Sequence, residues 1–173
     1  HRAVLQAGTN EVVDQLNAAV LAHLEAAGKV SGEARSFGGI GVRVGELVTI
    51  RTNHYDPDIG VNIINGQTGV VTRVGRATIN LRDVQTGRDV SLGPRYFDGG
   101  GRLSHGYAST THRTQGGTWD MSIMVGTDGL YREGAYVAMS RGRAHNLIVA
   151  TEPELVALDL YLDQSGSTRH DQG

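Results

Sequence analysis

The spacing of apolar and polar residues predicts a strand and then a helix at the start of the chain. The short apolar run Ala3–Leu5 is typical of a β-strand, and Gly8-Thr9-Asn10 follows it. Beyond Glu11, apolar residues recur at helical intervals, at Val12, Val13, Leu16, Ala19, Val20 and Leu24. Gly28 is a plausible end for this helix, and the side-chain oxygen of Thr9 or Asn10 can cap its first turn. We expect the helix to pack on a sheet.

The period of the pattern changes to two after a glycine-rich connection at Ser31–Gly41. One strand is expected over residues 42–50, broken at Gly45-Glu46, and further strands over 69–74, 77–84 and 90–92. The intervening segments carry turn signals such as Asn65-Gly66, and His54–Asp58 is expected to form a long loop. Short strands joined by glycine-containing turns predict a small β-barrel of the SH3-like kind.

Strands and helices alternate again in the last part of the chain. We expect strands at Tyr107–Thr111, Met121–Val125 and Asn146–Ala150, the last two of them buried. Helices are predicted from about Thr114, over 130–139 and over 152–162, followed by a polar, disordered tail. The sequence therefore predicts an α/β domain made of residues 1–38 and 105–163, a barrel inserted at 39–104, and a tail at 164–173.

Composition narrows the possible functions. A net charge of −2 argues against a protein that coats nucleic acid by bulk charge, but a local groove is compatible with it. Every Lys or Arg except Lys29 is an arginine, the residue suited to planar phosphate contacts. The absence of cysteine excludes disulfides and thiolate metal sites and fits a cytoplasmic location. No apolar run is long enough for a membrane span, so no membrane partner is expected.

The richest concentration of polar chemistry lies between His105 and Asp120, around the predicted end of a strand. In α/β sheets, ligands bind beyond the carboxyl ends of the strands. A metal site built from His105 and His112, with His54 and Asp120, is disfavoured because no pair has chelating spacing. A serine nucleophile at Ser109 or Ser140, served by His112 and Asp120, is disfavoured because neither serine lies in a nucleophile elbow.

The third interpretation of this stretch is a surface for nucleic acid and phosphate. Short side chains that can donate hydrogen bonds to the phosphates of a DNA backbone are present at Thr110, Thr111 and His112. Gln115 and Gly116, at a predicted helix start, can approach a nucleotide phosphate closely. Arg141 follows an apolar helix and precedes a glycine, which suits a guanidinium that reaches a transferring phosphoryl group. Arg143 is the competing candidate.

Two of these segments resemble signature motifs of a known family. Tyr107-Ala-Ser-Thr-Thr-His-Arg-Thr-Gln-Gly and Tyr136-Val-Ala-Met-Ser-Arg-Gly-Arg are similar to the last two motifs of superfamily 1 helicases. The match is closest to the RecD-like branch, which includes the helicase portion of conjugative relaxases. Thr9-Asn10 with Leu16-Asn17 resembles the preceding motif, and residues 45–53 and 65–71 resemble the edges of the barrel inserted in the second motor domain. Thr118 is a departure, because relatives often carry an acid there.

The resemblance implies a RecA-like second motor domain with an inserted SH3-like β-barrel. It also implies roles for single residues. Thr110, Thr111, His112 and Arg113, with Thr9 and Asn10, would bind single-stranded DNA. Gln115 and Gly116 would couple this contact to the nucleotide, and Arg141 would be the arginine finger of ATP hydrolysis.

The sequence contains no P-loop motif, Gly-x-x-x-x-Gly-Lys-Ser/Thr. ATP and Mg²⁺ would therefore be bound mostly by an N-terminal motor domain of the same polypeptide. We expect this chain to be the C-terminal motor domain of an ATP-dependent DNA helicase, inactive alone, with a possible protein partner at the barrel. The alternative is a non-catalytic nucleic-acid or protein-binding module derived from a helicase domain.

Overall fold

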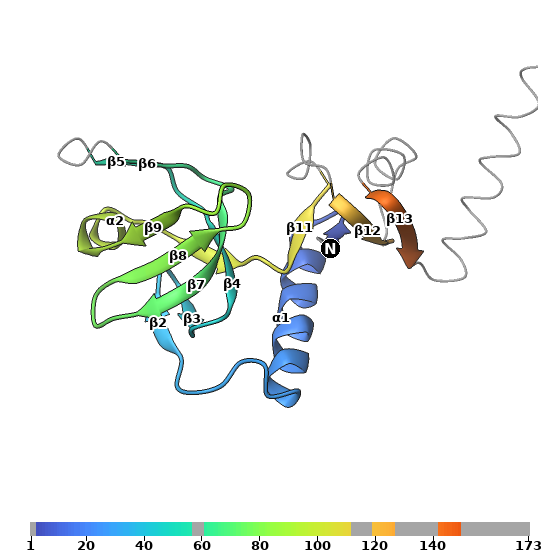
Figure 1. Ribbon diagram of the computed structural model, residues 1–173, viewed down its shortest axis with the longest axis horizontal. Helices are drawn as coiled ribbons and strands as arrows, with labels where there is room; N and C mark the ends of the chain where they lie inside the picture. Colours follow the sequence, from blue (N-terminus) through green and yellow to red (C-terminus); the bar gives the residue numbers. More distant parts are fainter. Residues whose placement is uncertain (1–2, 57–60, 112–118, 127–141, 150–173) are drawn as a thin grey trace, which may run out of the picture. The chain divides into compact units, whose positions relative to one another are not determined.

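The computed structural model describes residues 3–56, 61–111, 119–126 and 142–149 (Figure 1). The chain divides into two units. The first contains the described residues up to Val13 and those from Ala108 onward, and the second is Asp14–Tyr107. Each unit is described by itself below.

The first unit is built on a four-stranded parallel sheet with the strand order β11-β1-β12-β13 (Figure 1). Its strands are β1 (Ala3–Ala7), β11 (Ala108–Thr110), β12 (Trp119–Val125) and β13 (Gly142–Val149). The strands predicted from the sequence in this part of the chain are thus confirmed. Parallel neighbours need long crossover connections, and the connection from β1 to β11 contains the whole second unit.

The interior of this sheet contains a polar pair. Gln6 on β1 is fully buried, and its Nε2 donates a hydrogen bond of 2.8 Å to Oγ of Ser122 on β12. Val4, Ala7 and Met124 are buried among the apolar residues of the same strands. A buried amide is tolerated only when its hydrogen bonds are made inside the protein, so this pair fixes the two strands side by side.

The prediction of a buried strand near the C-terminus is half right. The strand β13 exists, but Leu147 and Val149 are 53% and 50% exposed, so the prediction of burial is wrong. Among the described strands, β13 lies at the edge of the sheet and pairs only with β12. Within the described ranges, its side chains therefore have strand neighbours on the β12 side only.

The helix α1 (Asn10–Ala26) follows β1 directly and confirms the predicted helix. Thr9 caps it, because its Oγ1 accepts a hydrogen bond from the Val12 amide and its carbonyl accepts one from the Val13 amide. At the other end Gly28 adopts a positive φ of 66°, and the Lys29 amide donates to the Leu24 carbonyl at 2.9 Å. A left-handed glycine at this position is the usual way to end a helix.

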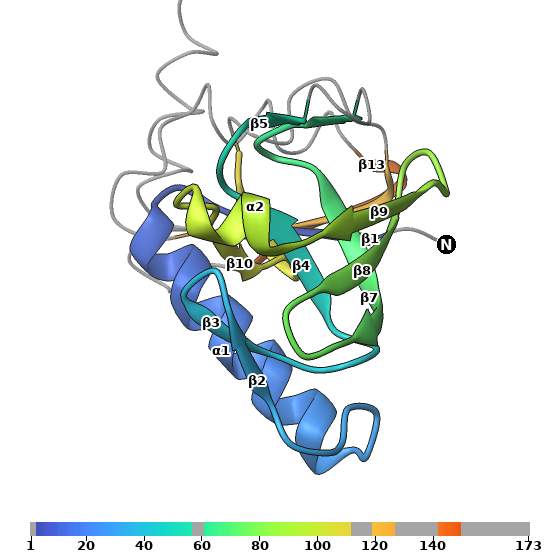
Figure 2. The same ribbon diagram turned by 90° about the vertical axis from the view of Figure 1, so that its left-hand side faces the viewer.

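The second unit contains a five-stranded antiparallel sheet with the order β10-β4-β7-β8-β9 (Figure 2). These strands are β4 (Leu47–Ile50), β7 (Thr68–Val74), β8 (Ile79–Asp83), β9 (Asp89–Leu92) and β10 (Leu103–His105). The last of these strands in sequence, β10, pairs with the first, β4, so the chain enters and leaves this sheet on neighbouring strands. The short helix α2 (Pro94–Asp98) connects β9 to β10.

Two hairpins in this unit differ from the expected pattern. Residues 31–41, expected to be a plain connection, contain β2 (Arg35–Phe37) and the start of β3 (Ile40–Val42), which pair with each other. The single strand predicted over 42–50 is therefore two strands, β3 and β4, separated by a turn in which Gly45 has a φ of 91°. In the expected loop, β5 (His54–Asp56) pairs with β6 (Val61–Ile63).

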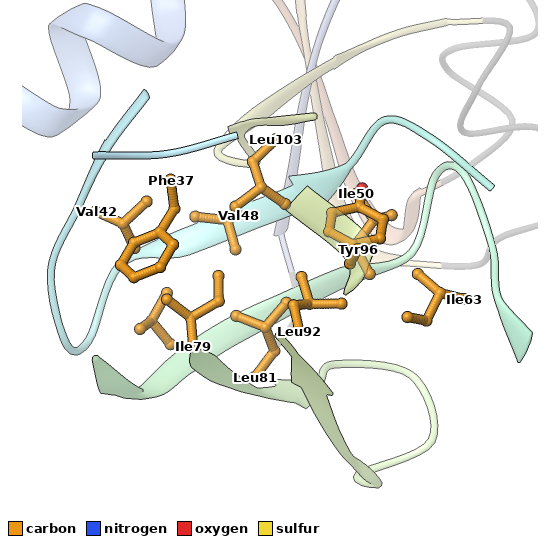
Figure 3. Close-up of a cluster of buried hydrophobic side chains, with 11 residues drawn as sticks. Phe37, Val42, Val48, Ile50, Ile63, Ile79, Leu81, Leu92, Tyr96 and Leu103 are labelled. Carbon is orange, nitrogen blue, oxygen red and sulfur yellow. The ribbon is translucent and has the colours of Figure 1, made fainter. Parts of the chain in front are cut away.

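The core of the second unit is apolar and comes from alternate positions of its strands (Figure 3). Its buried members are Phe37, Val42, Val48, Ile50, Ile63, Val71, Ile79, Leu81, Leu92, Tyr96 and Leu103. The hydroxyl of Tyr96 donates to the Arg102 carbonyl at 2.9 Å, and burial raises the pKa of this phenol. In the part of the chain that the structure describes, no helix is both long and apolar enough to cross a membrane.

Candidate nucleic-acid interface

The carboxyl ends of β1 and β11 lie next to each other, because the two strands are parallel and Ala7 is in register with Thr110. The next residue, Thr111, donates its amide to the Ala7 carbonyl at 3.2 Å and its hydroxyl to the same oxygen at 3.4 Å. The Thr111 hydroxyl also lies 3.8 Å from Sδ of Met124 on β12. Three strand ends therefore meet at this edge of the sheet.

The turn from β1 into α1 forms the exposed part of this edge. Gly8, Thr9 and Asn10 are all exposed, and a Cβ atom added to Gly8 would meet no atom within 4 Å. They stand at the N-terminus of a 17-residue helix, where free amides and the helix dipole favour an anion. The edge thus offers open backbone and short polar side chains, which suit a phosphate group of a nucleic acid.

Thr110, the last residue of β11, and Thr111, the residue after it, have a different environment from these turn residues. Thr110 and Thr111 are buried, at 9% and 6% exposure. The Thr111 hydroxyl is engaged with the Ala7 carbonyl, so in this structure it secures the end of β11 to β1. Of the residues predicted to bind DNA, Thr9 and Asn10 are exposed, whereas Thr110 and Thr111 are buried.

The other predicted site residues lie outside the described residues. These are His112, Arg113, Gln115, Gly116 and Arg141. The histidines considered for a metal site have other neighbours: His54 lies edge-on to Tyr96 at 5.9 Å between ring centroids, and His105 stacks on Tyr107 at 6.2 Å. Within the described ranges, no group of three or more His, Asp or Glu residues is placed to hold a metal ion.

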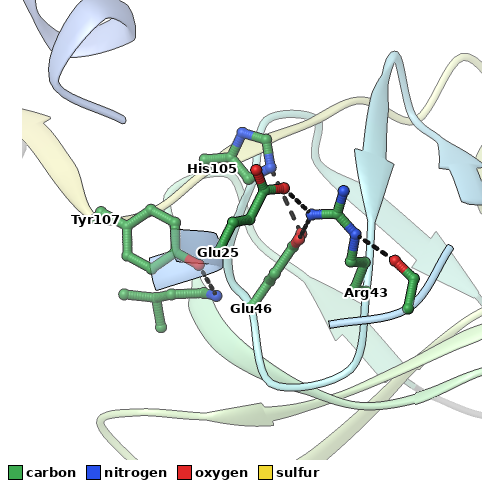
Figure 4. A network of polar contacts seen from close by, with 7 residues as sticks. Glu25, Arg43, Glu46, His105 and Tyr107 are labelled. Carbon is green, nitrogen blue, oxygen red and sulfur yellow. Dashed lines mark hydrogen bonds and ion pairs between the residues drawn. The ribbon is translucent and has the colours of Figure 1, made fainter. Parts of the chain in front are cut away.

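A charged network in the second unit was not predicted from the sequence (Figure 4). The carboxylate of Glu46 is fully buried, and it contacts Arg43 Nη1 at 3.1 Å and His105 Nε2 at 3.5 Å. Arg43 also pairs with Glu25 of α1. The hydroxyl of Tyr107 accepts a hydrogen bond from the Leu47 amide at 3.4 Å, and burial raises the pKa of this phenol. The sequence signal was a pair of opposite charges, Arg43 and Glu46, three residues apart in a mostly apolar run.

Comparison with solved structures identifies helicases with the same fold. A Pif1 helicase structure that addresses DNA unwinding at forked duplex DNA matches with a TM-score of 0.61 and 19% identity, over 95% of this chain and 45% of that one. Pif1 from Candida albicans matches with a TM-score of 0.60 and 16% identity, over 95% and 50%. Bacteroides Pif1, in complex with ADP-AlF3 and single-stranded DNA, matches with a TM-score of 0.57 and 17% identity, over 95% of this chain and 46% of that one.

Comparison of sequences identifies relatives among conjugal transfer proteins. The probable conjugal transfer protein TraA of Sinorhizobium fredii is 33% identical over 85 residues, or 48% of this chain and 7% of that protein. The conjugal transfer protein TraA of Rhizobium radiobacter is 35% identical over 81 residues, or 46% of this chain and 7% of that protein. The chain thus spans a small part of these relatives, and no family model matches it.

Proposed function

From the fold of superfamily 1 helicase motor domains and the sequence likeness to TraA, we propose that this chain is the C-terminal motor domain of an ATP-dependent DNA helicase. The helicase would belong to the RecD-like branch and resemble the helicase portion of a conjugative relaxase. It would act in the cytoplasm on single-stranded DNA. The observation that supports this best is the sheet edge where β1 and β11 end together.

We infer that DNA binds along this edge. The exposed turn at Thr9 and Asn10 would contact the backbone of the strand, and Thr111 would hold the end of β11 beside it. The residues that follow Thr111, His112 and Arg113, would continue the contact. The chain's net charge of −2 means that binding depends on such local donors and not on bulk attraction.

The proposed part in ATP hydrolysis rests on the motif resemblance. Arg141 would stabilise the negative charge that develops on the transferring phosphoryl group, and Gln115 and Gly116 would link the DNA contact to the nucleotide. The bound Mg²⁺–ATP would supply the phosphoanhydride bond that is cleaved. A P-loop is absent from this sequence, so the remaining phosphate contacts would come from another domain of the same polypeptide.

We further propose that the antiparallel unit is an SH3-like barrel inserted into a RecA-like domain. In support, five short strands follow the order β10-β4-β7-β8-β9 around one apolar core, with a short helix before the last strand. The boundaries 1–38, 39–104 and 105–163 remain the sequence-based proposal for the three segments. A partner protein at the barrel belongs to the same proposal.

The test is ATP hydrolysis by the full-length gene product, with and without single-stranded DNA. Arg141→Ala should reduce DNA-stimulated turnover by about a thousandfold or more, as expected for loss of an arginine finger. Arg143→Ala is the matched control and should keep most of the activity. The 173-residue chain alone should hydrolyse no ATP.

Other outcomes would change the conclusion in different ways. Turnover that survives Arg141→Ala but is lost in Arg143→Ala would move the finger to the second arginine. A full-length product that hydrolyses no ATP would contradict the motor and favour the non-catalytic binding module.

A further inference from the structure

Three arginines lie at the turn that joins β7 to β8 in the second unit (Figure 1). Arg73 is in the last part of β7, and Arg76 is in the turn itself. The third, Arg35, comes from β2, and its Nη1 donates a hydrogen bond of 3.1 Å to the Gly75 carbonyl. All three residues are exposed. We call Arg35, Arg73 and Arg76 the arginine patch.

The turn that carries the patch is tightly built. The Gly75 amide donates to the Thr78 carbonyl at 2.8 Å, and a Cβ atom on Gly75 would lie 2.8 Å from Oγ1 of Thr78. Because the Gly75 carbonyl is also the acceptor for Arg35, the guanidinium from β2 is held beside the hairpin that carries the other two arginines. The remaining N–H groups of the Arg35 guanidinium have no partner among the described residues, so they are available to an anion.

The outer face of the sheet continues the patch with neutral hydrogen-bonding groups. Arg73 of β7 is in register with Asn80 of β8, which is in register with Ser91 of β9. Residues in register share a face of the sheet, and Ile79 and Leu81 on either side of Asn80 are buried, so this row points away from the core. The Ser91 hydroxyl donates to Oδ1 of Asn80 at 3.3 Å, which leaves the Nδ2 donors of Asn80 for another acceptor.

The arginine patch has no paired carboxylate in the part of the chain that the structure describes. Arg82, on the same hairpin, is by contrast paired with Asp89 at 3.0 Å. Positive charges gathered without counter-charges raise the local potential, which attracts a polyanion. Arginine also carries the planar donors that match the geometry of phosphate. The patch therefore suits the phosphate backbone of a nucleic acid.

The surroundings of the patch favour duplex DNA over a single strand. Proteins that bind single strands combine cationic groups with exposed aromatic rings on which the bases stack. Among the described residues of the second unit, the exposed aromatic residue is Tyr55, which lies on the hairpin of β5 and β6. Phe37, two residues from Arg35 in β2, is buried in the core. Guanidinium and amide donors without a stacking ring suit a duplex, whose phosphates face outward and whose bases are already stacked.

We propose that the arginine patch is a second DNA-binding site of this chain and that it holds the phosphate backbone of duplex DNA without reading its sequence. Arg35, Arg73 and Arg76 each contact a phosphate, and Asn80 adds a neutral hydrogen bond beside them. The inference rests on neither the proposed edge of the first unit nor ATP hydrolysis, because every residue of the patch belongs to the second unit.

Fluorescence anisotropy of the 173-residue chain with a labelled duplex, at several NaCl concentrations and without ATP, tests the site. Arg35→Gln, Arg73→Gln and Arg76→Gln should each weaken binding about three- to tenfold, as expected for the loss of one phosphate contact. Each should also lower the slope of the logarithm of the association constant against that of the salt concentration by about 1, and the triple variant by about 3. The urea midpoint should stay as in the wild type, because all three residues are exposed.

Arg88→Gln is the matched control. It removes the same charge from an exposed arginine of the same unit, in the turn at the other end of β8. That turn is roughly 17 Å along the strand from the patch, which exceeds the screening length of about 10 Å at 0.1 M salt. Affinity for the duplex should therefore stay within about twofold of the wild type. An equal loss in Arg88→Gln would overturn the site and attribute binding to bulk charge.

A single-stranded oligothymidine of the same length tests the choice of ligand. The triple variant should lose more affinity for the duplex than for the single strand, and equal losses would overturn the assignment to duplex DNA. A wild type that binds no duplex, or a triple variant that keeps the wild-type salt slope, would overturn the site itself. Loss of binding to polyglutamate in place of DNA would make the patch a site for an acidic protein and overturn the DNA assignment. The proposed motor is tested separately, by ATP hydrolysis of the full-length product.

Discussion

Thr111 donates both its amide and its hydroxyl to the carbonyl oxygen of Ala7, a residue 104 positions earlier in the chain. These two hydrogen bonds hold the residue that follows β11 against the last residue of β1. The whole second unit lies between the two residues in sequence. The proposed DNA-contacting edge therefore exists only after the chain has passed through that unit and returned.

Removal of the Thr111 hydroxyl should weaken the first unit. Thr111→Val keeps the side-chain shape but loses the donor to Ala7, so the free energy of unfolding should fall by about 1 kcal/mol. Urea denaturation followed by fluorescence of Trp119, the single tryptophan, reports on this unit because Trp119 lies in β12. Ser109→Ala in β11 is the control, since no hydrogen bond of its hydroxyl is found among the described residues. Equal effects of the two changes would contradict the role of the Thr111 hydroxyl.

The exposed turn after β1 should contribute to DNA affinity. Asn10→Ala should weaken binding of a single-stranded oligothymidine about two- to tenfold, the loss expected for one hydrogen bond to a phosphate. Thr9→Ala should weaken binding too, and should also destabilise the chain by about 1 kcal/mol because it removes the cap of α1. Fluorescence anisotropy and urea denaturation measure the two effects. Asn62→Ala, an exposed asparagine in β6, should bind as the wild type does.

Gly101 is required for packing against Tyr96. A Cβ atom at this position would lie 2.4 Å from two ring carbons of the buried Tyr96, so the ring would have to move out of the core. Gly101→Ala should lower the free energy of unfolding by about 1–3 kcal/mol, as overpacking usually does. Gly93→Ala is the matched control, because its Cβ would meet its nearest neighbour, Thr78, at an ordinary 3.7 Å. Thermal unfolding followed by tyrosine circular dichroism compares the stability of the Gly101→Ala and Gly93→Ala variants.

Asp83 should make the second unit sensitive to acid. Burial alone would raise its pKa, but the amide and hydroxyl of Thr86, the Gln85 amide and the Gln67 side chain donate to the carboxylate and hold its pKa below the ordinary value. A carboxyl with a lowered pKa in the folded state stabilises the fold above its unfolded pKa. That stability is lost as the pH falls through the folded value.

Urea midpoints measured from pH 7 down to about pH 2 test this. The urea midpoint of the wild type should decrease once the pH drops below about 4, where an unfolded aspartate takes up its proton. Asp83→Asn should be less stable at pH 7 and should lose less on acidification. Asp98→Asn, which alters an exposed carboxyl, should keep the wild-type acid profile. An acid profile unchanged in Asp83→Asn would show that other groups control the transition.

Local patterns were enough to predict many of the elements. β1 and α1 follow from an apolar run, a capping threonine and helical spacing, all of which act within a few residues. β7, β8 and β9 follow from alternation between turn signals. The hairpin of β2 and β3 was missed because its glycines gave the appearance of a plain connection. Gly38 and Gly39 both adopt a positive φ in its turn.

These local patterns could not predict contacts between segments that are distant in the sequence. The sequence by itself determined β1, α1, β7, β8 and β9, and the motif residues that resemble a helicase, because these depend on neighbouring residues. Only the tertiary structure decided that Thr110 and Thr111 are buried and that Glu46 is enclosed by Arg43 and His105. Such burial depends on which strands pair across long stretches of chain, and hydrophobic periodicity carries no information about a partner some sixty or a hundred residues away.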